Sequence, residues 1–164
     1  MYPVSLGYAA ATSRISNLLA SGHETEALVT AVFTAEKTLR RTLRQIVVSA
    51  GFISRIADRI MSGLRGLDSV KNGWDIYDPK HRKLSDLLQA SDWHAIKVAA
   101  EMRNKLVHGE RVYSVDACRL AATDALRALD NIKTVLDVEY GYSGWTTAKS
   151  RRASTLHSDP KIRV

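Results

Sequence analysis

The residues best suited to carry chemistry are Arg103, Asn104 and His108, which fall within one run of six residues. The guanidinium group of arginine can neutralise charge on a phosphate, and the imidazole of histidine can take up or release a proton near neutral pH. RNA cleavage needs both abilities, because a 2′-hydroxyl attacks the neighbouring phosphate when a base removes its proton and an acid protonates the leaving 5′ oxygen. We therefore expect Arg103 to stabilise the phosphate, His108 to act as acid or base, and Asn104 to orient imidazole or phosphate.

The spacing of arginine and histidine is informative only in its local context. Arg152 and His157 repeat it, but in a stretch rich in Ser, Lys and Arg that lacks the apolar period of a helix. The first copy instead closes a predicted helix over residues 92–107. Ser91 is the expected N-cap of this helix, and Gly109 is the expected stop just past its end. The motif should therefore lie at the C-terminal end of a well-defined helix.

Two charged residues interrupt apolar helix faces and are expected to meet. Arg103 falls on the apolar face formed by Trp93, Ile96, Ala99, Ala100, Leu106 and Val107. Glu36 lies on the face of a long helix predicted over residues 24–50, whose apolar positions are Leu28, Val32, Phe33, Leu39, Leu43, Ile46 and Val47. A buried carboxylate is costly unless it is paired, so Arg103 is the expected partner of Glu36. The alternative to a supporting role in catalysis is a structural ion pair that fixes helix register.

Residues 103–108 resemble the R-N-x-x-x-H signature of the HEPN superfamily, compact helical domains found in many ribonucleases of bacterial defence and toxin systems. Residues 33–40 are similar to the family's helix that carries an inward polar or acidic residue before a Leu-Arg pair. The resemblance covers roughly residues 24–140, including the order of long helix, second helix, motif helix and long last helix. It implies a homodimer in which the motif ends of two protomers meet around one RNA cleft. Glu110 stands where toxins silenced by nucleotide transfer carry a tyrosine, so that form of control is not expected.

The length and composition predict one all-α domain, a HEPN-like bundle of four to five main helices. A chain of 164 residues with 45% hydrophobic content can form one core. We expect the domain to cover residues 1–140, with an N-terminal helix at about 5–20 and a core at 24–140. The remaining expected elements are a helix through Ile53 to Leu67, a packed loop over 68–79, a short helix at 84–88 and a last helix capped by Ser114.

The single Cys118 is expected in the core of a cytoplasmic protein, since it cannot form an internal disulfide. No run of 18 apolar residues is present, so no membrane association is expected. The sequence also lacks a cysteine pair, an H-E-x-x-H motif and a Gly-rich phosphate loop, so neither a metal nor a cofactor is predicted.

The positive charge is concentrated near the C-terminus. Residues 141–164 contain five basic residues and one acidic residue, which give +4 of the formal net charge of +7. This stretch is expected to be a flexible basic tail that assists RNA binding. Within the folded part, the candidate phosphate-binding residues are Arg40, Arg44, Arg82 and Lys105.

The expected function is that of a metal-independent endoribonuclease in a bacterial toxin-antitoxin or antiphage system, acting on RNA as a homodimer and restrained by an antitoxin or regulatory partner. Two alternatives remain open. One is a non-catalytic HEPN-like module that binds RNA, a nucleotide or a partner protein, and the other is a helical dimerisation protein with a basic tail. Exposure of His108 discriminates between them, because an open cleft at this residue favours the enzyme, whereas a buried imidazole bonded to backbone favours the modules.

Overall fold

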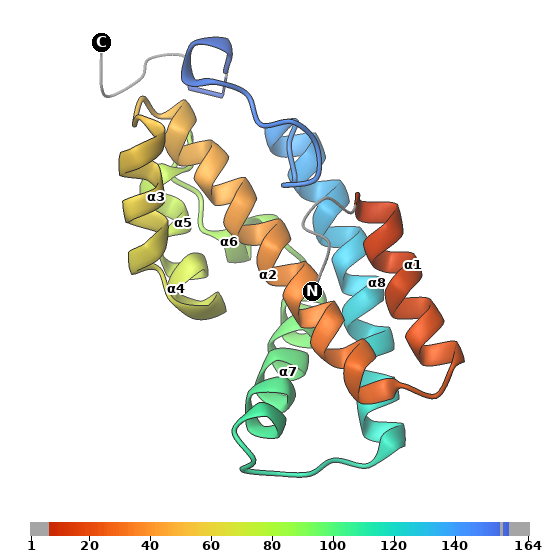
Figure 1. The fold of residues 1–164 in the computed structure, drawn as a ribbon. Helices are drawn as coiled ribbons and strands as arrows, with labels where there is room; N and C mark the ends of the chain where they lie inside the picture. Colours follow the sequence, from red (N-terminus) through yellow and green to blue (C-terminus); the bar gives the residue numbers. More distant parts are fainter. Residues whose placement is uncertain (1–6, 155, 158–164) are drawn as a thin grey trace. The chain divides into compact units, whose positions relative to one another are not determined.

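The computed structural model describes residues 7–154, 156 and 157, and its regular elements are helices (Figure 1). They are α1 (Tyr8–Ala20), α2 (Glu24–Ser49), α3 (Ser54–Gly63), α4 (Gly66–Asn72), α5 (Trp74–Tyr77), α6 (Leu84–Leu87), α7 (Ala90–Val107), α8 (Val115–Tyr140) and the short 3-10 helix η1 (Arg151–Ala153). No strand occurs among the described residues, so the predicted all-α class is confirmed. The predicted HEPN-like arrangement of the helices stays a prediction.

The chain divides into two compact units, and the expectation of one domain over residues 1–140 stays a prediction. The motif unit comprises the described residues up to 35 and residues 90–132, and the second unit comprises residues 36–89 and the described residues from 133 onward. Helices α2 and α8 contribute to both units, because each continues across a boundary between these ranges. The residues predicted to act together are thereby divided: the Arg103 motif belongs to the first unit, and Glu36 belongs to the second.

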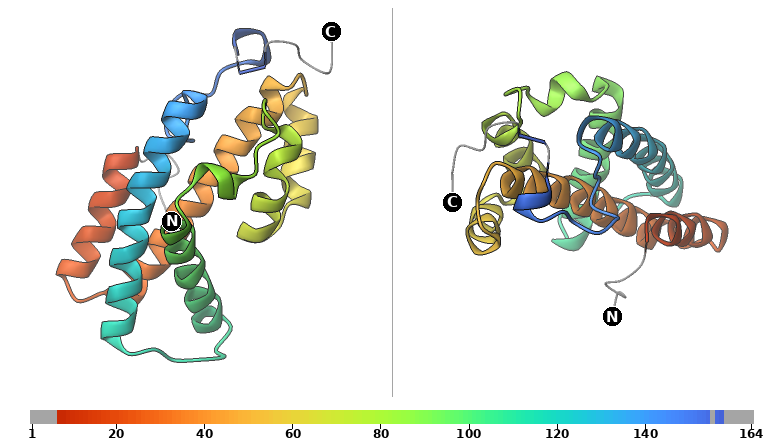
Figure 2. Two further views of the ribbon diagram at one scale, coloured as in Figure 1. Left: turned by 180° about the vertical axis from the view of Figure 1, so that it is seen from behind. Right: turned by 90° about the horizontal axis from the view of Figure 1, so that it is seen from above.

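The motif unit packs α1, the first part of α2, α7 and the first part of α8 around a core rich in alanine. Its fully buried side chains are Ile15, Ala27, Leu28, Ala31, Val32, Ala99, Ala122, Ala125, Ala128 and Leu129. Small side chains let helix axes approach closely, and α1 runs alongside α8 in Figures 1 and 2. The hydroxyl of Tyr8 on α1 donates to Asp130 on α8, and Asn131 of α8 donates to the buried Asp92 of α7 at 3.2 Å.

Two residues assigned to apolar faces by their spacing are not in the core. Phe33 is 50% exposed, because the buried face of α2 runs through Leu28, Val32 and Ala35, and Phe33 lies about 100° beyond Val32 around the helix. Val107 is 65% exposed because it lies in the last turn of α7, past the end of the core. Periodicity identified the apolar face of each helix, but the core covers a narrower face of α2 and a shorter length of α7 than periodicity predicted.

The helix expected through Ile53 to Leu67 is wrong as a single element, because α3 ends at Gly63 and α4 begins at Gly66. The start of α7 also differs from its predicted signal. That helix begins at Ala90, so Ser91 lies within it and is not the N-cap. The stop at Gly109 is confirmed, since this residue has a left-handed φ of 67°. The N-terminal cap of α8 is also confirmed, because the backbone N–H of Ala117 donates to the hydroxyl of Ser114 at 3.2 Å.

The second unit contains the second part of α2, helices α3 to α6 and the end of α8. Its region at 68–79 is not the predicted loop, because α4 extends to Asn72 and α5 begins at Trp74. The expectation that this region is packed is confirmed, since Trp74 is completely buried. The short helix expected at 84–88 is also present, as α6.

A buried hydrogen-bond network centred on Asp78 connects α5, α8 and the segment before α6. The Asp78 carboxylate accepts hydrogen bonds from the Tyr140 hydroxyl at 2.5 Å and from the Arg82 guanidinium at 3.3 Å, and Trp74 donates to Tyr140 at 2.9 Å. Burial raises the pKa of Asp78, but the hydrogen bonds from Tyr140 and Arg82 outweigh burial and hold that pKa below its ordinary value. Burial and the bond to Asp78 raise the pKa of Tyr140. Asp78 is therefore a charged carboxylate whose oxygens accept several hydrogen bonds.

The C-terminal segment, defined here as residues 141–154, packs on α2 in the second unit instead of forming the predicted flexible tail. Tyr142 and Ser143 are buried. The indole of Trp145 donates to the hydroxyl of Thr38 at 2.8 Å, and the Lys37 ammonium lies 4.1 Å from the centre of that ring. Burial lowers the pKa of Lys37, with a smaller contribution from a neighbouring arginine. The rest of the predicted tail, residue 155 and residues 158–164, lies outside the described residues.

Replacing Gly144 with alanine is expected to destabilise the protein by about 2–4 kcal/mol. Gly144 has a φ of +88°, and an added Cβ would lie 2.8 Å from Cβ of Arg41 and 3.3 Å from the carbonyl oxygens of Lys37 and Thr38. Gly141 is the matched control, since its φ is also left-handed at +63° but no atom lies within 4 Å of an added Cβ. Gly141→Ala should cost only the backbone strain, about 1 kcal/mol. Urea denaturation of both variants checks this, and equal losses would contradict the packing of this segment.

Candidate functional site

His108 occupies the C-cap position of α7, where a Schellman motif fixes its backbone. The N–H of Gly109 donates to the carbonyl of Leu106 at 3.1 Å, and the N–H of Glu110 donates to the carbonyl of Lys105 at 2.8 Å. The left-handed φ of Gly109 makes both bonds geometrically accessible. The backbone of His108, and with it the Cβ atom that carries the imidazole, is therefore fixed although the residue lies at a helix end.

The three predicted catalytic residues differ in exposure. Arg103 is partly buried and lies one turn after the buried residues Ala99 and Ala100 on the same face of α7. Asn104, Lys105 and His108 are exposed to solvent. A partly buried guanidinium next to exposed amide and imidazole groups can face a ligand while it remains anchored at its base. His108 is exposed, so its imidazole is not the buried, backbone-bonded group expected of a non-catalytic module.

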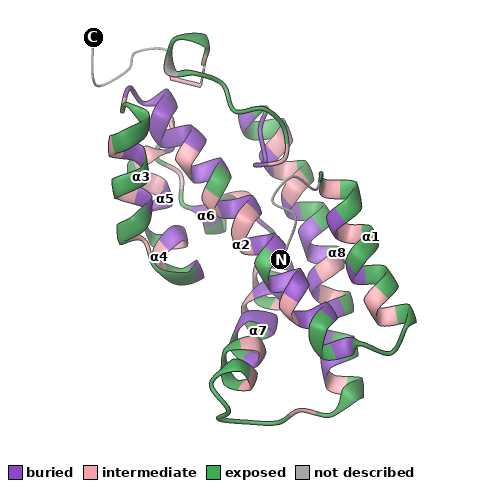
Figure 3. Cartoon of the chain, viewed as in Figure 1, coloured by how far each residue is buried: buried purple, intermediate pink, exposed green. Residues whose placement is uncertain are grey.

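Apolar side chains surround the motif at this end of the unit. Val107, Val112 and Val115 are 65%, 90% and 60% exposed, and they bracket the turn that joins α7 to α8. The turn is exposed along most of its length in Figure 3. Three valines with this exposure within nine residues are unusual for a solvated turn, since scattered single hydrophobic residues are the ordinary pattern. The sequence contained this signal, but the periodicity of the flanking helices assigned only Val107, and assigned it to the core.

The other predicted site residues belong to the second unit, and most of their polar groups are used there. Arg40 donates to the carbonyl oxygens of Met61 and Leu64 at the end of α3. Arg44 pairs with Asp58 at 2.7 Å. These contacts fix α3 against α2 and engage guanidinium donors that were assigned to phosphate.

Arg82 and Glu36 complete the set of predicted residues in the second unit. Arg82 pairs with the buried Asp78 and with Glu139 at 2.7 Å, so its charge is compensated within the fold. Glu36 is partly buried and lines a cavity of about 340 Å³ together with Arg40 and Arg65. The predicted ion pair between Glu36 and Arg103 stays a prediction, because the two residues belong to different units.

The described residues hold no cluster of three or more His, Cys, Asp or Glu side chains that could bind a metal ion. Within the same residues, no helix has both the length and the apolar character required to cross a bilayer. Cys118 is buried and free, which confirms its expected place in the core.

Comparison with protein-family models, curated proteins and solved structures gives no match for this chain. The chemistry of the site therefore has to be judged from the residues at the end of α7. A guanidinium, an amide and an imidazole there provide hydrogen-bond donors for a phosphate and one group that can exchange a proton.

Proposed function

We propose that this chain is a metal-independent endoribonuclease of the HEPN type. The observation that carries the proposal is the arrangement at the C-terminal end of α7, where a partly buried Arg103 accompanies exposed Asn104 and His108. The activity is inferred from the resemblance of these residues to the R-N-x-x-x-H signature, and the exposure of Asn104 and His108 to solvent supports the inference. A buried, backbone-bonded His108 would have argued against the proposal.

In the proposed reaction, one His108 removes the proton from a 2′-hydroxyl, and the 2′ oxygen forms a bond to the adjacent phosphorus. The bond from phosphorus to the 5′ oxygen breaks, and a second histidine protonates that leaving oxygen. Arg103 donates hydrogen bonds to the phosphate oxygens as negative charge accumulates on them. The products are a 2′,3′-cyclic phosphate and a 5′-hydroxyl, and no metal takes part.

The second histidine comes from a second copy of the chain, because each chain contributes only one motif at this helix end. The exposed Val107, Val112 and Val115 support an interface here, since exposed apolar groups next to a polar site are typical of surfaces that a partner covers. A symmetric homodimer would bring Arg103 and His108 of both copies around one RNA strand. Such an activity fits a toxin or antiphage protein restrained by an antitoxin or regulatory partner.

The direct test is incubation of the purified full chain with mixed cellular RNA in EDTA. We expect fragments that end in a 2′,3′-cyclic phosphate, because the proposed reaction requires no metal. Fragment ends can be identified by mass spectrometry and by their resistance to ligation at the 3′ end until the cyclic phosphate is opened and the remaining phosphate is removed. The dependence of cleavage on a divalent ion, or 3′-hydroxyl ends, would contradict the mechanism.

Replacing Val112 with aspartate is expected to weaken dimerisation at least about tenfold and to reduce cleavage in parallel, because the new charge would be buried at the interface. Val112 is 90% exposed within one chain, so the monomer fold should tolerate the change. Val138→Asp is the matched control, since Val138 is 78% exposed at a position far along α8 from the motif end. Sedimentation equilibrium and RNA cleavage measure both effects. A wild type that is monomeric at micromolar concentration and fully active would refute the dimer.

A non-catalytic module that binds a partner protein is the second candidate, and the same three exposed valines favour it. It differs from the ribonuclease in needing no imidazole at position 108. Loss of the His108 side chain therefore separates the two functions.

A further inference from the structure

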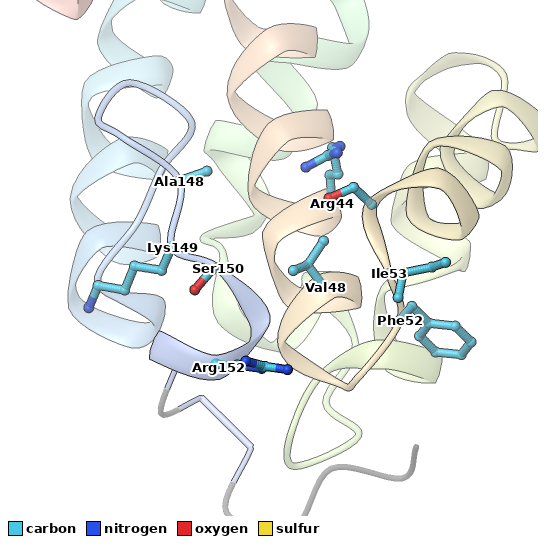
Figure 4. Close-up of a pocket in the computed structure, with 9 residues that line it drawn as sticks. Arg44, Val48, Phe52, Ile53, Ala148, Lys149, Ser150 and Arg152 are labelled. Carbon is cyan, nitrogen blue, oxygen red and sulfur yellow. The ribbon is translucent and has the colours of Figure 1, made fainter. Parts of the chain in front are cut away.

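A cavity of about 530 Å³ opens in the second unit, between the end of α2 and the C-terminal segment (Figure 4). Residues of the α2 end and the following turn form one wall, and residues around η1 form the other. The side chains that matter for its chemistry are Arg44, Val48, Phe52, Ile53, Ser150 and Arg152. Its volume falls within the range of about 300–1,000 Å³ that is typical of small-molecule sites.

Hydrogen bonds connect the two walls of the cavity and fix them relative to each other. The Gln45 amide donates to the carbonyl oxygen of Lys149 at 3.0 Å. The hydroxyl groups of Ser49 and Ser154 lie 2.5 Å apart. Both contacts connect α2 to the C-terminal segment on either side of Arg152, and a site with fixed walls loses less entropy when it binds a ligand.

One part of the cavity is apolar and contains an oriented aromatic ring. Val48 is buried, and Ile53 remains 49% exposed beside it. The ring of Phe52 is held edge-to-face against Tyr77, with centroids 6.1 Å apart and an interplanar angle of 81°. Such a surface can accept a flat, apolar group of a ligand.

The other part of the cavity is cationic. Figure 4 shows the Arg152 side chain reaching toward Val48, and Arg44 extending from α2 above it, while the Lys149 side chain points away. None of the described residues that line the cavity is acidic. Arg44 and Arg152 lie on opposite sides of Val48 in Figure 4, and Arg44 is paired with Asp58, so Arg152 is the residue placed to hold an anion. Its planar donors suit phosphate oxygens.

We propose that this cavity binds a nucleoside monophosphate, with the phosphate at Arg152 and the base against Phe52 and Ile53. Inorganic phosphate would leave the apolar part of the cavity empty, and a nucleoside would offer Arg152 no phosphate oxygen. The site is separate from the proposed ribonuclease site, because its residues all belong to the second unit and none is in the α7 motif. Nucleotide binding can therefore succeed or fail independently of RNA cleavage.

The test is isothermal titration calorimetry of the full chain with AMP, adenosine and inorganic phosphate. We expect saturable binding of AMP, and affinities at least about tenfold lower for adenosine and for phosphate, since each lacks one half of the contacts. Arg152→Ala should weaken AMP binding about tenfold or more. Arg59→Ala is the matched control, because Arg59 is an exposed arginine on α3 that does not line the cavity, and it should leave binding unchanged.

Phe52→Leu provides a second, independent variant that keeps an apolar side chain but removes the ring. It should weaken AMP binding while leaving phosphate binding unaltered. No saturable AMP binding at millimolar concentration, equal binding of adenosine, or equal losses in Arg152→Ala and Arg59→Ala would each overturn the proposal. Binding of a short RNA at least about tenfold tighter than AMP, with the same dependence on Arg152, would assign the cavity to a strand instead of a mononucleotide.

Discussion

His108→Ala should remain folded and dimeric but lose RNA cleavage by a factor on the order of 10² to 10⁴. The imidazole is exposed, and the Schellman motif that ends α7 uses only backbone groups, so truncation should cost little stability. His94→Ala is the matched control, since His94 is an exposed histidine near the start of the same helix. Single-turnover cleavage of a defined RNA and thermal melting measure the two effects. Undiminished cleavage by His108→Ala would rule out the mechanism, and full loss in the His94 variant would show that the assay follows something other than the motif.

The corresponding change at Arg103 is harder to interpret. Arg103 is partly buried, so Arg103→Ala can both remove phosphate stabilisation and disturb the packing of α7. If the predicted pair with Glu36 exists, it also leaves a carboxylate without its partner. The double variant Glu36→Gln/Arg103→Ala separates the effects, because it should regain stability relative to Arg103→Ala without regaining cleavage.

Asp78→Ala is expected to destabilise the protein by about 3–5 kcal/mol, the cost of removing one member of a buried charged network. The substitution leaves the buried Tyr140 hydroxyl without its acceptor and removes a carboxylate that accepts from Arg82. Glu139→Gln is the control, because Glu139 pairs with the same arginine from a more exposed position and should change stability by no more than about 1 kcal/mol. Chemical denaturation of both variants provides the measurement, and similar losses would contradict the central place of Asp78.

The same network predicts how stability depends on pH. The pKa of Asp78 in the folded protein lies below the ordinary value of 3.8, so the folded state binds this proton less readily than the unfolded state. The stabilisation is complete above the ordinary value and is lost as the pH falls through the folded-state pKa. Asp78→Asn should therefore lose less stability than the wild type between neutral pH and about pH 3.

Local signals in the sequence predicted the helices better than they predicted the core. Gly109 and Ser114 gave correct boundaries because turn and cap chemistry is local. Phe33 and Val107 were wrongly assigned to the core, because periodicity indicates which face of a helix is apolar but not where a covering helix ends.

The candidate site was predictable in part. Its three residues lie together at the end of one helix, where sequence spacing alone determines proximity. Arg40, Arg44 and Arg82 were chosen by charge, which does not reveal that α3 carbonyls and the carboxylates of Asp58 and Asp78 already engage them. The packing of Trp145 against α2 was missed because that contact joins residues 107 positions apart.

Two of the contacts that hold the C-terminal segment use its backbone carbonyl oxygens, those of Gly144 and Lys149. Every residue type supplies such an oxygen, so these contacts place no demand on the side chain at position 149. The glycine at 144 and the indole at 145 are the demanding positions. We therefore expect a protein with the same docked segment to keep a glycine–tryptophan pair shortly after its last helix. The basic residues of the segment can differ between such proteins.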